Sequence, residues 1–182
     1  TRMAEALTTT ALTFSLDDEL LKATGYTGVN DSVESYLRTL AVSGSGSIDF
    51  PSVAPQRTAF AVSIGFESFQ TFFENFEKNL QQDVAEYQTY RESLRQVENY
   101  LDIDLHEHFI SWVGDEVALL EMQSYGPGAD NETALMFKAR DLGKARAGLA
   151  HIEKMIRRKT PVKFRTVEYR GHAISYLSMK GL

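Results

Sequence analysis

The spacing of apolar residues changes along the chain, and each spacing predicts one kind of element. In residues 11–40 it predicts a hairpin followed by a short helix. The first strand alternates apolar and polar residues over positions 12–16, and its partner spans positions 20–27. Asn30 or Asp31 offers a side-chain oxygen that would cap the helix.

Residues 41–55 interrupt this pattern with a Ser-Gly-Ser-Gly-Ser run and two prolines, a composition typical of a linker. We therefore expect residues 1–50 to form the N-terminal hairpin and helix, and residues 51–182 to form the main domain. Two readings of the N-terminal unit stay open. It belongs either to a preceding repeat or to the same domain, with residues 41–55 then forming a surface loop.

Aromatic residues recur every three or four positions after residue 65, which predicts an amphipathic helix whose stripe includes Phe66, Phe69, Phe73, Phe76 and Leu80. The regular spacing of the stripe is interrupted at Gln81-Gln82-Asp83, so residues 67–101 form either one long helix or two. Burial of one Phe side chain stabilises a fold by roughly 1.5–3 kcal/mol. The stripe is therefore interpreted as core and not as a ligand site.

The remaining elements follow from alternation and capping signals. Phe60, Val62 and Ile64 alternate with small residues, which predicts a strand that could be covered on both faces. Further predicted elements are strands at 116–123 and 133–139, an open turn at 125–131 and a hairpin at 164–177. A helix capped by Asp141 is also predicted, with these residues facing inward: Leu142, Ala145, Leu149, Ile152, Met155 and Ile156.

From about residue 57 this order is strand, helix, strand, strand, helix, strand, strand. It predicts an α+β fold with an antiparallel sheet, helices on one face and a ferredoxin-like (split β-α-β) order. The second sheet face would then be free for a partner. A contiguous exposed apolar patch on that face would support a binding role.

Composition narrows the classes of function. The 182 residues are 43% hydrophobic and 24% charged, as in globular proteins. A net charge of -6 argues against a nucleic-acid partner, because such proteins neutralise phosphates with Lys and Arg. The absence of cysteine excludes disulfides, thiolate nucleophiles and cysteine-ligated metals.

No apolar run reaches the roughly 20 residues of a membrane helix, and the N-terminus lacks a signal-peptide core. Any membrane association would therefore come through a segment outside this chain. The chain opens without Met and stops directly after a strand-like run, so we expect it to be a fragment of a longer protein.

The candidate chemistry lies in residues 101–122, which are called the hinge below because they join the predicted helices to the predicted strands. Five residues of this segment have side chains that commonly bind metal ions and could serve a metal-dependent hydrolase: Asp102, Asp104, His106, Glu107 and His108. Residues two apart on a helix point about 200° away from each other, so the two histidines could share a metal only in an extended segment. We favour a short helix from Leu105 to Val113, capped by Asp104, with both histidines in solvent. We predict no metal and no cofactor.

Asp115 and Glu116 could form an acid–base pair, but neighbouring residues of a strand point to opposite faces. They are interpreted as a turn and a strand edge. The sequence contains no assembled set of nucleophile, base and orienting residue, and no phosphate-binding glycine loop. No catalytic residue is predicted, and a non-enzymatic role is favoured.

Three motifs together resemble one family: Pro55-x-x-Thr58 before an apolar strand, Asp104-Leu-x-x-x-Phe-x-x-Trp-x-Gly-Asp-Glu-Val-Ala118, and Lys138-x-x-Asp-x-x-Lys-Ala-x-x-x-Leu149. Over roughly residues 55–180 the chain resembles the bacterial domain of unknown function 3352 family. The resemblance implies an exported or membrane-anchored envelope protein, placed in the periplasm or outside the cytoplasmic membrane, and it implies no reaction. The matched positions that look like structural signatures are Trp112, Gly114, Asp115, Glu116 and Asp141.

These observations favour a non-enzymatic exported domain with a binding or structural role in the bacterial cell envelope, and with an unidentified protein or ligand as partner. The first alternative is the metal-dependent hydrolase built on residues 102–108. The second is a purely structural repeat of a larger assembly.

Overall fold

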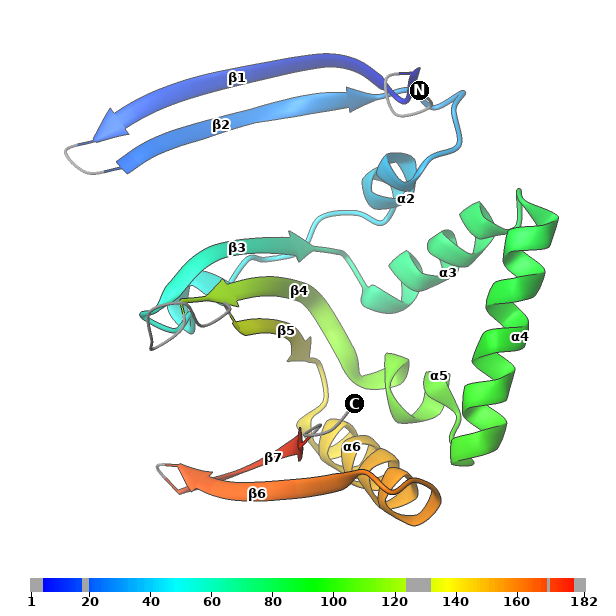
Figure 1. The fold of residues 1–182 in the computed structure, drawn as a ribbon. Coiled ribbons are helices and arrows are strands. Elements are labelled where there is room, and N and C mark those ends of the chain that lie inside the picture. The colour runs from blue at the N-terminus through cyan, green and yellow to red at the C-terminus, as the bar shows by residue number, and fades with distance from the viewer. Residues whose placement is uncertain (1–4, 18–19, 124–131, 170, 179–182) are drawn as a thin grey trace.

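The computed structural model describes residues 5–17, 20–123, 132–169 and 171–178. Within these ranges the chain forms an α+β fold in which all paired strands are antiparallel (Figure 1). The predicted α+β class is therefore confirmed. The open turn predicted at 125–131 lies outside the described residues.

The N-terminal region is the predicted hairpin followed by a helix. Strands β1 (Leu7–Asp17) and β2 (Leu20–Val29) pair with each other, and α2 (Tyr36–Val42) follows. The predicted cap is wrong, because the Ser35 side chain accepts the hydrogen bond from the Arg38 amide at the start of α2. Asn30 instead accepts from the Ser32 amide at 3.0 Å, which closes a turn between β2 and the helix.

The glycine-rich segment after α2 is packed against the rest of the chain. A Cβ atom at Gly46 would lie 2.2 Å from the Phe66 carbonyl oxygen, so only glycine permits this approach. Phe50 begins a short 3-10 turn, η1 (Phe50–Ser52), and is only 8% exposed. The composition that suggests a linker therefore serves close packing here.

The central sheet has the strand order β3 (Thr58–Gly65), β4 (Val113–Met122) and β5 (Glu132–Ala139). The ferredoxin-like order is not confirmed. In a split β-α-β unit, the strands joined by the helix run parallel with another strand between them, whereas β3 and β4 are antiparallel neighbours. The helical segment between them, residues 69–112, returns the chain to the end of the sheet that it left.

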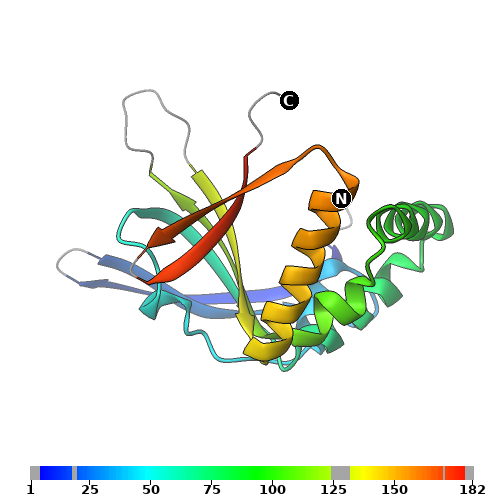
Figure 2. The same cartoon turned by 90° about the horizontal axis from the view of Figure 1, so that it is seen from below.

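The aromatic stripe forms two helices, α3 (Phe69–Leu80) and α4 (Val84–Leu101), as one of the two alternatives predicted. Asp83 caps the second by accepting from the Ala85 and Glu86 amides. The shorter α5 (Leu105–His108) and the 3-10 turn η2 (Ile110–Trp112) lead into β4. Figures 1 and 2 show these helices at one end of the central sheet, so the predicted cover of one sheet face is not confirmed.

Helix α6 (Leu142–Lys159) packs on α5 and η2 through small residues. A Cβ atom at Gly148 would lie 2.1 Å from the His108 carbonyl oxygen, which shows how closely the helices approach. The predicted inward face is confirmed for Ala145 and Met155, which are buried, and is wrong for Leu142 and Leu149, which are 65% and 49% exposed. Ala145, Gly148 and Met155 are the buried residues of this helix.

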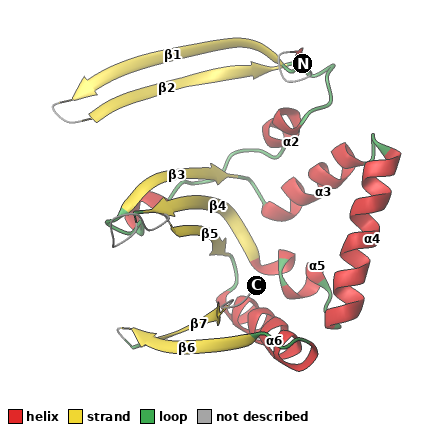
Figure 3. Cartoon of the chain, in the orientation of Figure 1, coloured by secondary structure: helices red, strands yellow, loops and turns green. Residues whose placement is uncertain are grey.

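The chain closes with the predicted hairpin of β6 (Lys163–Tyr169) and β7 (His172–Ser178). Gly171 lies in its turn with a φ of 79°, a conformation that favours glycine. This hairpin and β1–β2 are two-stranded sheets separate from the central one, as Figure 3 shows. No helix within the described ranges is long and apolar enough to cross a membrane.

Candidate functional site

One face of the central sheet is the candidate functional site. It carries Phe60, Val62, Leu119 and Leu135, which are 56%, 43%, 44% and 56% exposed, and these four residues are called the open face below. Val62 pairs with Leu119, and Leu119 pairs with Leu135. The register therefore sets three apolar side chains side by side across the three strands, with Phe60 at the next position of β3 on the same face.

The open face ends where the helices begin. Its neighbouring row contains Ile64, Val117 and Phe137, which are partly buried. Phe137 packs edge-on against Phe109 and Phe69, with ring centroids 4.9 Å and 6.2 Å away. The helical end thus covers one row of this sheet face and leaves the next row exposed.

The opposite face of the same sheet is covered by the segment around η1. Phe50 packs there on Ala118 and Leu120, which are 2% and 1% exposed. Partly buried side chains surround this cluster: Ala54, Met122, Ala134 and Met136. Because side chains alternate along a strand, Leu119 lies on the exposed face of the sheet and Leu120 lies on the covered face.

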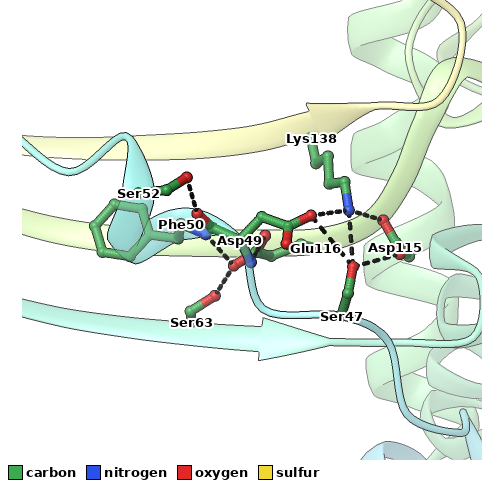
Figure 4. Close-up of polar contacts among 8 residues, drawn as sticks. All are labelled: Ser47, Asp49, Phe50, Ser52, Ser63, Asp115, Glu116 and Lys138. Atoms are coloured by element: carbon green, nitrogen blue, oxygen red, sulfur yellow. Dashed lines mark hydrogen bonds and ion pairs between the residues drawn. The ribbon is translucent and has the colours of Figure 1, made fainter.

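A buried carboxylate holds the covering segment in place. Glu116 is 4% exposed, and its carboxylate accepts hydrogen bonds from the Asp49 amide at 2.9 Å, the Phe50 amide at 3.0 Å and the Ser63 hydroxyl at 2.6 Å (Figure 4). A buried charge is tolerated when such donors replace its lost hydration. Glu116 therefore joins the 49–50 backbone to β3 and β4.

Burial raises the pKa of the Glu116 carboxyl, but the hydrogen bonds from Ser63, Asp49 and Phe50 outweigh this effect and leave the pKa below its usual value. The group is therefore ionised at neutral pH. A general acid or base works best with a pKa near the working pH, so this carboxylate suits anchoring better than proton transfer.

Lys138 makes a second polar connection beside Glu116. Its Nζ lies 2.7 Å from Asp49 Oδ2, 3.0 Å from Asp115 Oδ1 and 2.9 Å from the Ser47 hydroxyl (Figure 4). The hydrogen bonds to Lys138 lower the pKa of Asp49 and of Asp115, and the same contacts raise the pKa of Lys138 to about 12. A lysine held in its protonated form is not a nucleophile.

Asp115 and Glu116 do not diverge as neighbouring strand residues would, because both contact the 47–50 segment. The register of β4 against β5 shifts between Val113 and Val117, which interrupts the regular alternation. The prediction of a turn and a strand edge is therefore wrong for Glu116. Its partners lie 53, 66 and 67 positions away, and no local sequence signal announces them.

A cavity of about 180 Å³ adjoins this polar cluster. It is lined by Asp49, Phe50, Val53, Glu116, Ala118, Met136, Phe137 and Lys138. Its three charged residues already bind one another or the backbone. Pockets for small molecules usually measure roughly 300–1,000 Å³, so this space is small for a ligand site.

The signature residues Trp112 and Gly114 lie in packed positions, whereas Asp141 is an exposed helix cap. Trp112 is 4% exposed, and its indole Nε1 donates to the His108 carbonyl oxygen at 2.7 Å. Gly114 lies inside β4, where a Cβ atom would stand 3.0 Å from the Lys138 carbonyl oxygen. Asp104 caps α5 through the Glu107 amide, and Asp141 caps α6 through the Lys144 amide.

The candidate metal ligands of this hinge are not gathered. Asp102 ends α4 with a φ of 55°, and His106 is exposed. The His108 ring receives a hydrogen bond from the Asp104 amide at 3.0 Å and stacks on His151 with centroids 4.1 Å apart, a pairing that the sequence does not signal. Within the described part of the chain, no three His, Asp or Glu side chains form a group that could hold a metal.

Comparison with known proteins gives one match. A family model described as "Protein of unknown function (DUF3352)" matches residues 3–175. The match includes the N-terminal hairpin, which the sequence motifs of residues 55–180 leave out. No curated protein and no solved structure matches the chain.

Proposed function

The chain belongs to the DUF3352 family, whose function is unknown, and from that premise we propose that it is a non-enzymatic binding domain of the bacterial cell envelope. Its open face docks a protein partner. The observation that carries the proposal is the exposed row of Val62, Leu119 and Leu135 across three paired strands. Contiguous apolar surface of this kind marks interaction sites in soluble proteins.

The chemistry of the partner follows from the side chains of the open face. Val, Leu and Phe offer dispersion contacts and apolar area but no hydrogen bonds that would orient a polar ligand. The net charge of -6 disfavours phosphate-rich partners. An apolar sheet or helix face of a protein fits this surface best.

The ionisable groups beside the sheet support a non-enzymatic role. The pKa of Glu116 is lowered by its hydrogen bonds against the effect of burial, and that of Lys138 is raised to about 12 by its carboxylate partners. Both groups therefore keep one charge state around neutral pH. The hydrolase alternative relies on residues 102–108, whose side chains serve as helix caps, as a ring stack or as solvated groups.

The proposed location, periplasmic or anchored outside the cytoplasmic membrane, rests on the family resemblance alone. It is tested by fusing the full-length gene to alkaline phosphatase and, separately, to β-galactosidase. We expect phosphatase activity only, since that enzyme folds in the oxidising space outside the membrane. Activity of the galactosidase fusion alone would overturn the location and leave the docking proposal standing.

The docking proposal is tested by photo-crosslinking in cells. A photoreactive phenylalanine analogue is introduced at Leu135 on the open face or, as a control, at Leu149, an exposed leucine of α6. We expect discrete protein adducts from position 135 and none from position 149. No adducts from 135, or the same adducts from both positions, would overturn the proposal.

A further inference from the structure

The β1–β2 hairpin is an amphipathic ribbon with one uncovered apolar face. Its register pairs Phe14 with Ala23 and Leu16 with Leu21, so these residues share a face with Leu12. Leu12, Phe14, Leu16 and Leu21 are 54%, 63%, 81% and 66% exposed. The other face carries mostly polar residues: Thr13, Ser15, Lys22, Thr24 and also Tyr26.

Such a ribbon requires a cover. A lone two-stranded hairpin is at best marginally stable in water, and a third strand or a packed face is needed to hold it. In Figure 1 the ribbon runs in roughly the same direction as β3 but apart from the central sheet, and α2 lies on the connection between them. Neither the ribbon nor the open face is covered by the other within one chain, since the apolar side chains of both stay exposed.

The total surface of the chain leaves room for a cover. The 20.5 kDa chain exposes 13406 Å², a total that also counts the residues outside the described ranges, whereas a folded monomer of that mass exposes about 8,800 Å². An interface at the lower end of the roughly 2,000–5,000 Å² of permanent homodimers would bury about 1,000 Å² on each chain, which is well below this difference.

The two uncovered faces match each other. The ribbon strands have 11 and 10 residues, and the strands of the central sheet have 8, 10 and 8. Both faces present Leu with Phe or Val, and two apolar sheet faces pack about 10 Å apart. Each chain carries one β1–β2 ribbon and one open face, so two copies cover these two surfaces on both chains in a closed two-fold arrangement.

Building on the proposed docking role of the open face, we infer that its occupant is the β1–β2 ribbon of a second copy of this chain. The dimer is reciprocal: Phe14 and Leu16 of each copy pack on Val62, Leu119 and Leu135 of the other. The polar side of each ribbon then faces solvent.

The absence of cysteine in the chain makes this geometry directly testable. One preparation carries Phe14→Cys, a second carries Leu119→Cys, and the two are mixed and oxidised. We expect a disulfide-linked heterodimer on a non-reducing gel. The matched control replaces Leu119→Cys by Leu149→Cys on α6, also an exposed leucine, and should give at least about tenfold less product.

The mass of the full chain in solution is measured by analytical ultracentrifugation. We expect a dimer at about 1 μM, and a Kd about tenfold higher or more for Leu16→Ser, a substitution at an exposed position that should leave the fold intact by circular dichroism. A monomer, or a dimer without the 14–119 crosslink, would overturn the inference. If the dimer is absent but position 135 photo-crosslinks to a different protein, the proposed docking function stands and only the dimer is ruled out. If position 135 gives no adduct at all, both the docking function and the dimer are ruled out.

Discussion

The two faces of the central sheet are built from the same three strands, yet one is closed and the other is open. Leu120 is 1% exposed, and Leu119, its neighbour in β4, is 44% exposed. Both residues are equally apolar, so composition does not decide their burial. The difference is the covering segment, whose Asp49 and Phe50 amides are held by Glu116 on one face only. Burial in this sheet therefore depends on a polar anchor as much as on apolar side chains.

The largest effect is expected at the helical end, where the open face stops. Trp112→Ala should lower the free energy of unfolding by about 3–5 kcal/mol, because it leaves a cavity against Phe109 and frees the His108 carbonyl oxygen. Urea unfolding followed by circular dichroism measures the change. His106→Ala, at an exposed position of the same hinge, is the control and should cost little; the reverse order would show that the hinge is not core.

The comparison of the faces is tested directly at neighbouring residues. Leu120→Ala should destabilise the chain by about 3 kcal/mol, since it empties a site packed against Phe50. Leu119→Ala should cost less than about 1 kcal/mol in the isolated chain, because its side chain already contacts water. Equal losses from the two variants, measured by the same unfolding experiment at low protein concentration, would break the distinction between a closed and an open face.

The anchor itself is tested by Glu116→Gln. The amide keeps the shape but can no longer accept three hydrogen bonds as a carboxylate, so we expect a loss of about 2 kcal/mol. Amide hydrogen exchange should also accelerate at Asp49 and Phe50. Unchanged exchange there would mean that packing alone holds the covering segment.

The smallest effect is the pH dependence of that anchor. The folded-state pKa of Glu116 lies below its usual 4.5, and those of Asp49 and Asp115 lie below 3.8. Stability from these groups is complete above the usual values and is lost as the pH falls through the lower folded values. We expect urea midpoints that fall below about pH 4.5, with a shallower fall for Glu116→Gln. A midpoint that rises on acidification would contradict the lowered pKa values.

The sequence predicts the elements well where the signal is local. Alternation at Leu12–Leu16 indicates the first hairpin, and the slip of the aromatic stripe at Gln81–Asp83 allows the two helices that form. The caps of α5 and α6 at Asp104 and Asp141 follow from side-chain type and position.

The arrangement of these elements depends on distant contacts that the sequence does not display. The Ser-Gly-Ser-Gly-Ser run indicates flexibility, but Gly46 is needed for close approach to Phe66. The alternation of Phe60 and Val62 predicts a covered strand, but the helices cover only the neighbouring row of that face, at Val117 and Phe137. The open face could therefore be found only from the sheet register and the position of the helices.

The carboxylate of Glu116 also sets an order of events during folding. Its hydrogen bonds connect residues 53 to 67 positions apart, so they can form only after the chain between them has become compact. Closing so long a loop lowers the conformational entropy of the chain before the stabilising contacts have formed. Helices α3 and α4 shorten the distance that this loop must span, and we expect them to form before the sheet. The last step to the native state would then be the packing of the 47–50 segment on one sheet face. The open face would be covered only when a partner binds.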